Sequence, residues 1–332
     1  MRVLHAPARQ GSPLPVREVA VEVEDLVKTF PAPGGGTLTA VDHVSFTVRR
    51  GEVFGFLGPN GAGKTTTLEI VEGLQSPTSG RTSVLGLDSQ RDRARMKERI
   101  GVQLQAGAYF DYLTLEEILD LFGSFYPRAV RPAELLERVG LLEKRRALVR
   151  ELSGGQAQRF SVVAALVNDP EVVFLDEPTT GLDPQARRNL WELVASIKEE
   201  GKTVVLTTHY MEEAEVLCDR VAIIDHGRIQ ALDAPMALIR QLPAAYRIRF
   251  VVRAALPTEE LRGLPGVAEV AGGGSEGGPE VSYELGVARA QETLPALIDW
   301  ARARGLALED VQVVPATLED VFLSLTGHAL RE

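Results

Sequence analysis

The chain has 332 residues, of which 45% are hydrophobic and 25% charged, a composition typical of a globular protein with about two domains. Its formal net charge of −10 argues against binding nucleic acid through bulk positive charge. A single cysteine, Cys218, excludes an intramolecular disulfide and a multi-cysteine zinc site. No apolar run approaches the ~20 residues of a membrane-spanning helix, and the N-terminus lacks a signal-peptide core, so we expect a cytoplasmic protein.

Residues 1–18 contain three prolines and little periodicity, so we expect a flexible arm. Residues 19–240 are predicted to form the larger domain. Its first strands are predicted at 19–30, 41–48 and 53–57. The last of these strands leads through the Gly-rich turn 58–66 into a helix at about 65–73.

Short apolar runs alternate with helical spacing through the rest of this domain. Helical spacing is predicted over 115–148, broken at Pro127 and Pro132, and then at 156–168, 184–199 and 211–217. Buried strands are predicted at 171–175, 203–207 and 221–225. Strands that alternate with helices indicate an α/β fold with a largely parallel sheet.

Residues 241–332 have a different character and are predicted to form a small α+β domain. Tyr246–Arg253 alternates as a strand does, and a second strand is predicted at Val281–Leu285. Residues 272–278 are predicted to form a surface loop, and 288–304 a helix. A last helix should begin at a Thr317–Asp320 capping box.

The Gly-rich turn fits the pattern G-x-x-x-x-G-K-[ST] between a strand and a helix. The candidate phosphate-binding residues are Gly58, Pro59, Asn60, Gly61, Ala62, Gly63, Lys64, Thr65 and Thr66. Glycines let backbone amides surround phosphate oxygens at a helix N-terminus, where the dipole favours anions. Lys64 can reach the β- and γ-phosphates, and the Thr65 hydroxyl can bind Mg²⁺. The alternative is a Gly-rich turn that precedes Lys-Thr by chance.

A second Gly-rich motif, Leu152-Ser-Gly-Gly-Gln156, lies at the start of the predicted helix 156–168. This pentapeptide resembles the signature of ATP-binding cassette (ABC) ATPases. The resemblance implies a P-loop NTPase fold, with a RecA-like core and a helical subdomain, and ATP as ligand. It also implies a head-to-tail dimer, in which each ATP lies between the phosphate loop of one subunit and Ser153, Gly154, Gly155 and Gln156 of the other. The alternative is an ordinary helix cap.

Two further motifs follow predicted strand ends in the order of that family. Asp176 and Glu177 end a buried strand, where open α/β sheets bind ligands. By resemblance, Asp176 holds Mg²⁺ through water, and Glu177 is the general base for the attacking water. His209 resembles the switch histidine that bonds the γ-phosphate. The alternatives are a turn cap for the acidic pair and a structural role for His209.

Three further positions complete the resemblance. Gln105 resembles the glutamine that contacts Mg²⁺ and senses the γ-phosphate, with Gln103 as its rival. Asp183 resembles the loop that crosses the dimer interface, and it can also cap the following helix. Phe30 resembles the aromatic residue that stacks on adenine, with a plain core phenylalanine as the alternative.

The partners are also inferred from resemblance. Six aromatic residues lie between Tyr109 and Tyr126, a segment that in ABC transporters receives a helix of the membrane subunit, although several of the rings can be core. The ending Pro315–Gly327 resembles drug-export ATPases of the daunorubicin-resistance type, whose permease is a separate chain. We therefore expect a peripheral exporter subunit on the cytoplasmic side of the membrane. We expect a homodimer in preference to a heterodimer, and no bound nucleic acid. The alternatives are a soluble ABC ATPase that acts on ribosomes or nucleic acid, and an importer subunit.

Overall fold

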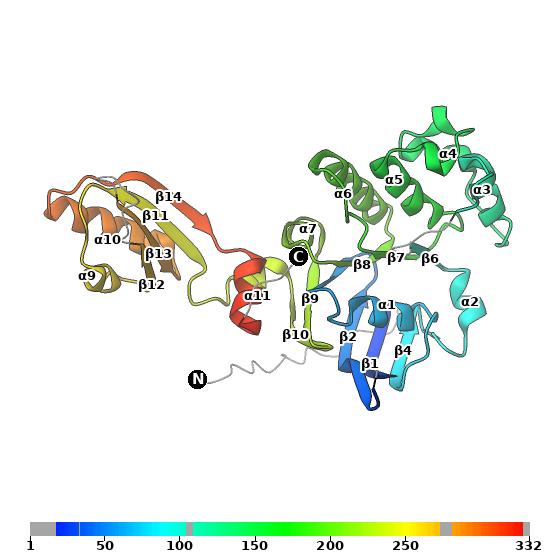
Figure 1. The fold of residues 1–332 in the computed structure, drawn as a ribbon, viewed down its shortest axis with the longest axis horizontal. Coiled ribbons are helices and arrows are strands. Elements are labelled where there is room, and N and C mark those ends of the chain that lie inside the picture. Colours follow the sequence, from blue (N-terminus) through cyan, green and yellow to red (C-terminus); the bar gives the residue numbers. More distant parts are fainter. Residues whose placement is uncertain (1–17, 33, 104–108, 273–280, 328–332) are drawn as a thin grey trace. The chain divides into compact units, whose positions relative to one another are not determined.

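The computed structural model describes residues 18–32, 34–103, 109–272 and 281–327 (Figure 1). The chain divides into two compact units, one up to Leu232 and the other covering Asp233–Arg331. Each unit is described by itself. None of the helices in the described ranges is both long and apolar enough to span a bilayer.

The first unit is built on a six-stranded sheet in the order β10-β9-β3-β8-β7-β6. The strands are β3 (Val53–Leu57), β6 (Ile100–Gln103), β7 (Val172–Asp176), β8 (Thr203–Thr208), β9 (Arg220–Asp225) and β10 (Arg228–Asp233). Five of them run parallel, β9 with β3, β3 with β8, β8 with β7 and β7 with β6. Every residue of β3, β7 and β8 is buried, which explains their continuous apolar sequences. The predicted α/β fold with a parallel sheet is confirmed.

A second, antiparallel sheet of the first unit has the order β2-β1-β4-β5. Its strands are β1 (Val19–Pro31), β2 (Thr37–Arg49), β4 (Ser79–Val84) and β5 (Leu87–Asp88). One hydrophobic core joins the two sheets around helix α1 (Lys64–Val71). In this core the Phe46 ring lies 5.4 Å from that of Phe54 and 5.0 Å from that of Phe56. Because this core packs against both β3 and α1, it holds in place the two ends of the predicted phosphate loop that joins them.

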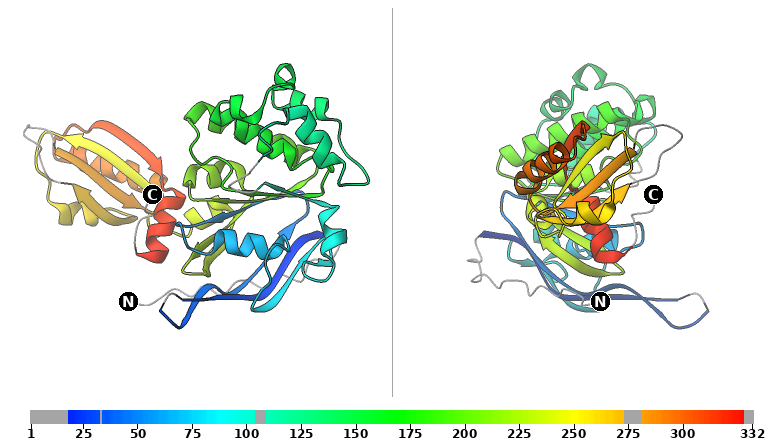
Figure 2. Two further views of the ribbon diagram at one scale, coloured as in Figure 1. Left: turned by 45° about the vertical axis from the view of Figure 1, so that its right-hand side comes forward. Right: turned by 90° about the vertical axis from the view of Figure 1, so that its left-hand side faces the viewer.

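The helices of the first unit form two groups. Around the parallel strands lie α1, α2 (Arg93–Lys97), α6 (Pro184–Glu199) and α7 (Met211–Leu217). A separate helical group contains α3 (Leu115–Gly123), α4 (Pro132–Arg138), α5 (Gly154–Ala164) and two short 3₁₀ turns, η2 (Leu142–Lys144) and η3 (Val149–Glu151). Figure 2 shows α3, α4 and α5, in green, on the side of the parallel sheet away from the antiparallel one. Pro132 starts α4, so the predicted break in the helical spacing is confirmed.

The second unit contains a four-stranded sheet in the order β12-β13-β11-β14. The chain runs through β11 (Tyr246–Val252), α9 (Thr258–Arg262), β12 (Val267–Gly272), β13 (Val281–Val287), α10 (Ala290–Ala303) and β14 (Glu309–Pro315). This β-α-β-β-α-β order is that of the ferredoxin-like motif. The sheet and helices enclose their own core. The predicted alternation of β11 is confirmed, because Ile248, Phe250 and Val252 are buried, while most of the predicted loop 272–278 lies outside the described residues.

Two more helices of the second unit, α8 (Pro235–Ile239) and α11 (Leu318–Thr326), pack against each other. The predicted capping box is confirmed at the start of α11, where the Thr317 backbone N–H donates to Asp320 Oδ2 at 2.9 Å. Arg247 of β11 forms ion pairs with both Glu284 and Asp320, and these pairs tie α11 to the sheet.

Candidate nucleotide-binding site

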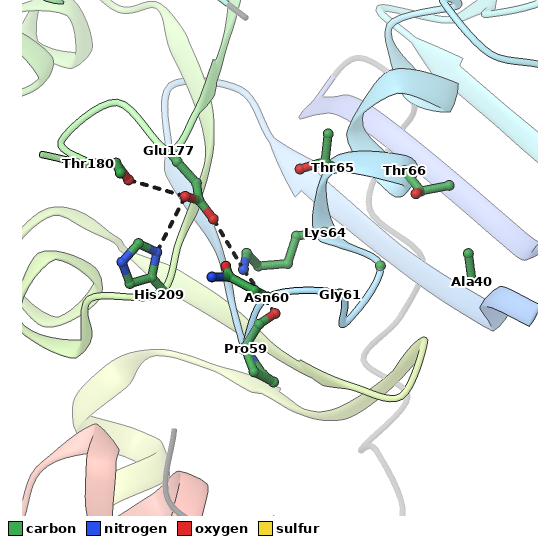
Figure 3. Close-up of a pocket in the computed structure, with 11 residues that line it drawn as sticks. Ala40, Pro59, Asn60, Gly61, Lys64, Thr65, Thr66, Glu177, Thr180 and His209 are labelled. Carbon is green, nitrogen blue, oxygen red and sulfur yellow. Dashed lines mark hydrogen bonds and ion pairs between the residues drawn. The ribbon is translucent and has the colours of Figure 1, made fainter. Parts of the chain in front are cut away.

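A cavity of about 490 Å³ opens where β3, β7 and β8 end (Figure 3). Its size is that of a small-molecule site. The lining residues are Ala40, Pro59, Asn60, Gly61, Gly63, Lys64, Thr65, Thr66, Glu177, Thr180 and His209. The cavity thus brings together most of the predicted phosphate loop with Glu177 and His209, from segments far apart in the sequence. Gly58 and Ala62 of the predicted loop are not among the lining residues.

The glycines of the loop allow backbone to approach backbone. Gly63 has φ of 100°, in the left-handed region, and a Cβ there would lie 2.3 Å from Ala40 O. A Cβ on Gly58 would lie 2.2 Å from Ile224 O. No side chain caps the N-terminus of α1, which begins at Lys64. Its first amides are therefore suited to bind an anion in the cavity.

Lys64 is 4% exposed and its ammonium group lies inside the site. Its Nζ donates to Gly58 O at 2.7 Å and lies 3.4 Å from Glu177 Oε1. Burial lowers the pKa of Lys64, and the Glu177 carboxylate acts in the opposite direction. The ammonium group is thus held in a poorly hydrated place where a phosphate would strengthen its charged form.

Oxygen ligands meet where β7 ends and α1 begins. Thr65 Oγ1 donates to Asp176 Oδ1 at 3.2 Å, and the Thr207 hydroxyl donates to the same oxygen. Asp176 is 4% exposed. A hydroxyl and a carboxylate are ligands that suit Mg²⁺ bound together with phosphates. Two of the three residues predicted to hold the metal, Thr65 and Asp176, therefore lie together and fit it, while Gln105 is outside the described residues.

Glu177 is held by its neighbours in a strained conformation. Its φ is 46°, in the left-handed region that is unfavourable for a side chain of this size. Its backbone N–H donates to Thr207 Oγ1 at 2.9 Å, and Thr180 Oγ1 donates to its Oε2 at 3.1 Å. His209 Nδ1 lies 3.4 Å from the same carboxylate oxygen (Figure 3). Backbone strain at a carboxylate that faces a lysine and a histidine is typical of a functional site.

Two threonines of the site, Thr180 and Thr207, were missed by the sequence reasoning. Thr180 follows Glu177 by three residues in the loop after β7, and Thr207 is a buried residue of β8. The only available signal was their closeness in sequence to Glu177 and to His209.

The signature residues do not line the cavity. Ser153 caps α5, since its Oγ accepts from the Gln156 backbone N–H at 3.4 Å, and Gln156 Oε1 accepts from the Ser153 backbone N–H at 3.1 Å. Gly154 and Gly155 are the first residues of α5. Asp183 caps α6 by accepting from two backbone N–H groups at 2.9 and 3.0 Å. The capping alternatives are thus confirmed, and roles across a dimer interface stay predictions.

The remaining predicted positions lie elsewhere. Gln105 is outside the described residues, whereas its rival Gln103 ends β6 and is 3% exposed. Phe30 is half-buried near the end of β1, opposite Leu38, and does not line the cavity. The Lys28 ammonium group lies 4.9 Å from the centre of the Phe30 ring. The contact of Phe30 with adenine stays a prediction.

Comparison with known proteins identifies the family. A family profile described as ABC transporter matches residues 41–180. The linearmycin resistance ATP-binding protein LnrL of Bacillus subtilis is 35% identical over 319 residues, which cover 94% of this chain and 100% of that protein. The chain belongs to the ABC transporter family. Its members bind and hydrolyse ATP, and hydrolysis drives transport, so the predicted fold and activity are confirmed.

Two other ATP-binding proteins and one solved structure are also similar to this chain. The Nod factor export ATP-binding protein I of Ralstonia nicotianae is 40% identical, over 94% of this chain and 95% of that one. The daunorubicin resistance ATP-binding protein DrrA2 of Streptomyces coeruleorubidus is 38% identical, over 93% and 95%. A solved dimeric cassette in a post-hydrolysis state with ADP and Pi has a TM-score of 0.59 at 26% identity, over 64% of this chain and 98% of that one. These similarities favour a transporter subunit over an ATPase of ribosomes. ABC cassettes of this kind dimerise and work with membrane permease subunits.

Proposed function

We propose that this ABC ATPase powers the export of a drug, a lipid or another hydrophobic compound. The observation that carries the ATPase part of the proposal is the cavity at the start of α1, where the Glu177 carboxylate lies 3.4 Å from Lys64 Nζ and 3.4 Å from His209 Nδ1. Relatives named for linearmycin resistance, daunorubicin resistance and Nod factor export support the direction of transport.

The described side chains support a division of roles. Lys64 and the amides of the glycine loop bind the β- and γ-phosphates of ATP. Glu177 accepts a proton from the attacking water, because its carboxylate lies in the cavity and is fixed by the Thr180 hydroxyl. His209 lies beside that carboxylate and is placed to bond the γ-phosphate. Thr65 and Asp176 would hold Mg²⁺, which would neutralise charge on the phosphates when bound.

The same proposal includes a homodimer. Ser153, Gly154, Gly155 and Gln156 present amides and a hydroxyl at an exposed helix start outside the cavity. A second copy can bring these groups to the γ-phosphate held at the first copy's phosphate loop. Asp183, which begins α6 after the Glu177 loop, would lie at the interface between the copies.

We also propose a permease-binding surface near the aromatic segment. Phe110, Tyr112 and Phe125 are 57%, 87% and 71% exposed. In contrast, Tyr109 packs against Phe160, with ring centres 5.3 Å apart. The exposed rings suit a helix of a separate membrane subunit, which would hold this chain on the cytoplasmic face of the membrane.

The direct test is the Glu177→Gln variant, made in the full chain. We expect kcat for ATP hydrolysis to fall about 10³-fold while ATP binding persists, because the amide cannot act as a base. An ATP-bound dimer should then accumulate, as measured by light scattering with ATP and with ADP. Hydrolysis at the wild-type rate would show that the role assigned to Glu177 is wrong.

A further inference from the structure

A fully buried carboxylate lies on α7, the helix that follows His209. Glu213 is 0% exposed. Its Oε1 accepts a hydrogen bond from Trp191 Nε1 of α6 at 3.3 Å, and its Oε2 has no hydrogen-bond partner. Burial raises the pKa of Glu213, while the side chains of Thr208, Thr179 and Trp191 oppose that rise. A buried carboxylate that is only partly hydrogen-bonded is costly, so its presence calls for a role.

The neighbours of Glu213 belong to the two segments that present the catalytic side chains. Thr179 lies two residues after Glu177, and Trp191 is on α6, which continues from that same loop. Thr208 directly precedes His209 at the end of β8. Glu213 is therefore hydrogen-bonded to α6, which follows the Glu177 loop, and it lies close to side chains of both the Glu177 segment and the His209 segment.

Contacts between neighbouring side chains link the same two segments. The Arg187 guanidinium carbon lies 4.3 Å from the centre of the Tyr210 ring, and that ring lies 4.1 Å from the His209 ring. Arg187 Nε is buried without a hydrogen-bond partner, and the charge of Arg187 favours the ionised form of Glu213. The Tyr210 backbone N–H donates to Thr208 Oγ1 at 2.9 Å, which fixes the turn at His209.

Four buried polar atoms without hydrogen-bond partners gather around this turn. They are Thr179 Oγ1, Arg187 Nε, His209 Nδ1 and Glu213 Oε2. In a native interior such atoms call for an explanation, because each one costs the free energy of its desolvation. Their place beside Glu213 and His209 links them to the two segments that carry the catalytic side chains.

We propose that Glu213 is a positioning residue for ATP hydrolysis. Its carboxylate holds α6 and the β8–α7 turn in register, so that His209 stays directed at Glu177. Glu213 does not line the cavity and does not touch nucleotide. This inference rests on the roles proposed above for Glu177 and His209.

The test compares Glu213→Gln with Glu212→Gln in the full chain. The amide of Glu213→Gln keeps the shape and an acceptor for Trp191 but removes the charge that faces Arg187. We expect kcat to fall about tenfold with KM for ATP within about twofold, because misplacement of a catalytic group slows chemistry more than binding. Glu212 is exposed on the same helix, so Glu212→Gln is the matched control and should retain the wild-type kcat. If Glu213→Gln fails to fold by circular dichroism, Trp191→Phe removes the other partner, and we expect it to lower kcat severalfold.

A double-mutant cycle with His209→Ala separates positioning from structure. If Glu213 acts through His209, Glu213→Gln costs about tenfold in the wild type and less than about twofold in the His209→Ala background. Equal costs in both backgrounds, or a wild-type kcat in Glu213→Gln, would overturn the inference. A wild-type kcat in His209→Ala would instead contradict the proposed site, so the two failures are distinguishable.

Discussion

Two helices of the cassette have glycines at their start, Gly63 directly before α1 and Gly154 and Gly155 in α5, and the two helix starts differ in what surrounds them. The start of α1 has no side-chain cap, faces a cavity, and carries the buried Lys64. The start of α5 is capped by Ser153 and Gln156 of its own chain and is exposed. The first faces the cavity that Lys64, Glu177 and His209 line, and no signature residue lines that cavity. We infer that the second helix start supplies groups to a phosphate held by another copy.

Lys64→Ala should have the largest effect, because it removes the only charged donor that the cavity lining supplies to phosphate within the described residues. We expect at least about 100-fold lower turnover, with weaker ATP binding, measured by phosphate release and nucleotide titration. Lys198→Ala is the control, since Lys198 is a partly exposed lysine paired with Asp219. Unchanged turnover in Lys64→Ala would contradict the assignment of the phosphate loop.

Ser153→Arg should abolish turnover about as strongly, but for a different reason. A bulky side chain at the exposed start of α5 would keep the signature groups from reaching the γ-phosphate held by a second copy, while the chains can still pair and the cavity of its own chain stays intact. We expect monomeric ATP binding within about twofold of wild type and turnover about 100-fold lower. If ATP binding to the monomer falls as far as turnover does, the two helix starts are not separate in function.

Glu72, at the C-terminal end of α1, gives a pH-dependent prediction. It is 2% exposed, and burial raises its pKa to about 8, with Asp176 and Glu69 adding to the rise. A raised folded-state pKa stabilises the protein below the unfolded-state pKa, near 4.5, and this contribution is lost as the pH rises through about 8.

Between pH 5 and pH 9 the free energy of unfolding should therefore fall less in Glu72→Gln than in wild type. The two decreases should differ by up to about a few kcal/mol. Denaturant unfolding at both pH values measures the difference. Parallel losses in the two proteins would show that Glu72 is ionised in the folded state.

Phe30→Ala should have the smallest effect. If Phe30 stacks on adenine, its loss should weaken ATP binding about fivefold, since one stacking contact contributes roughly 1 kcal/mol. Phe125→Ala, an exposed ring of the aromatic segment, is the control. Equal affinity for ATP in wild type and Phe30→Ala would contradict the adenine contact and leave Phe30 with a structural role in the β1–β2 pair.

The sequence predicted best where local signals and tertiary structure agree. The helix 184–199 was predicted with both of its observed ends. Its start was clear because Asp183 and Pro184 form a strong start signal. The edge strands β12 and β14 were missed, since most of their side chains are exposed and the apolar alternation is weak. The domain change predicted near residue 241 lies close to the division after Leu232.

Within the site, sequence motifs placed Lys64, Asp176, Glu177 and His209 but not the two threonines that hold Glu177. Threonines such as Thr180 and Thr207 are common in strands and loops, so nothing distinguished them before the fold brought them to Glu177. Glu213 belongs to the segment Met-Glu-Glu-Ala-Glu, which has the composition of an exposed acidic helix. Its burial depends on the packing of α7 against α6, which no local pattern contains.

The most direct test of the shared site mixes two inactive proteins, Lys64→Ala and Ser153→Arg. Each homodimer lacks either both phosphate loops or both signatures. In the mixed dimer, the intact phosphate loop of the Ser153→Arg chain meets the intact signature of the Lys64→Ala chain, so one complete site forms. We predict that mixing restores ATP hydrolysis well above the sum of the separate proteins. Activity equal to that sum would contradict a site shared between two copies.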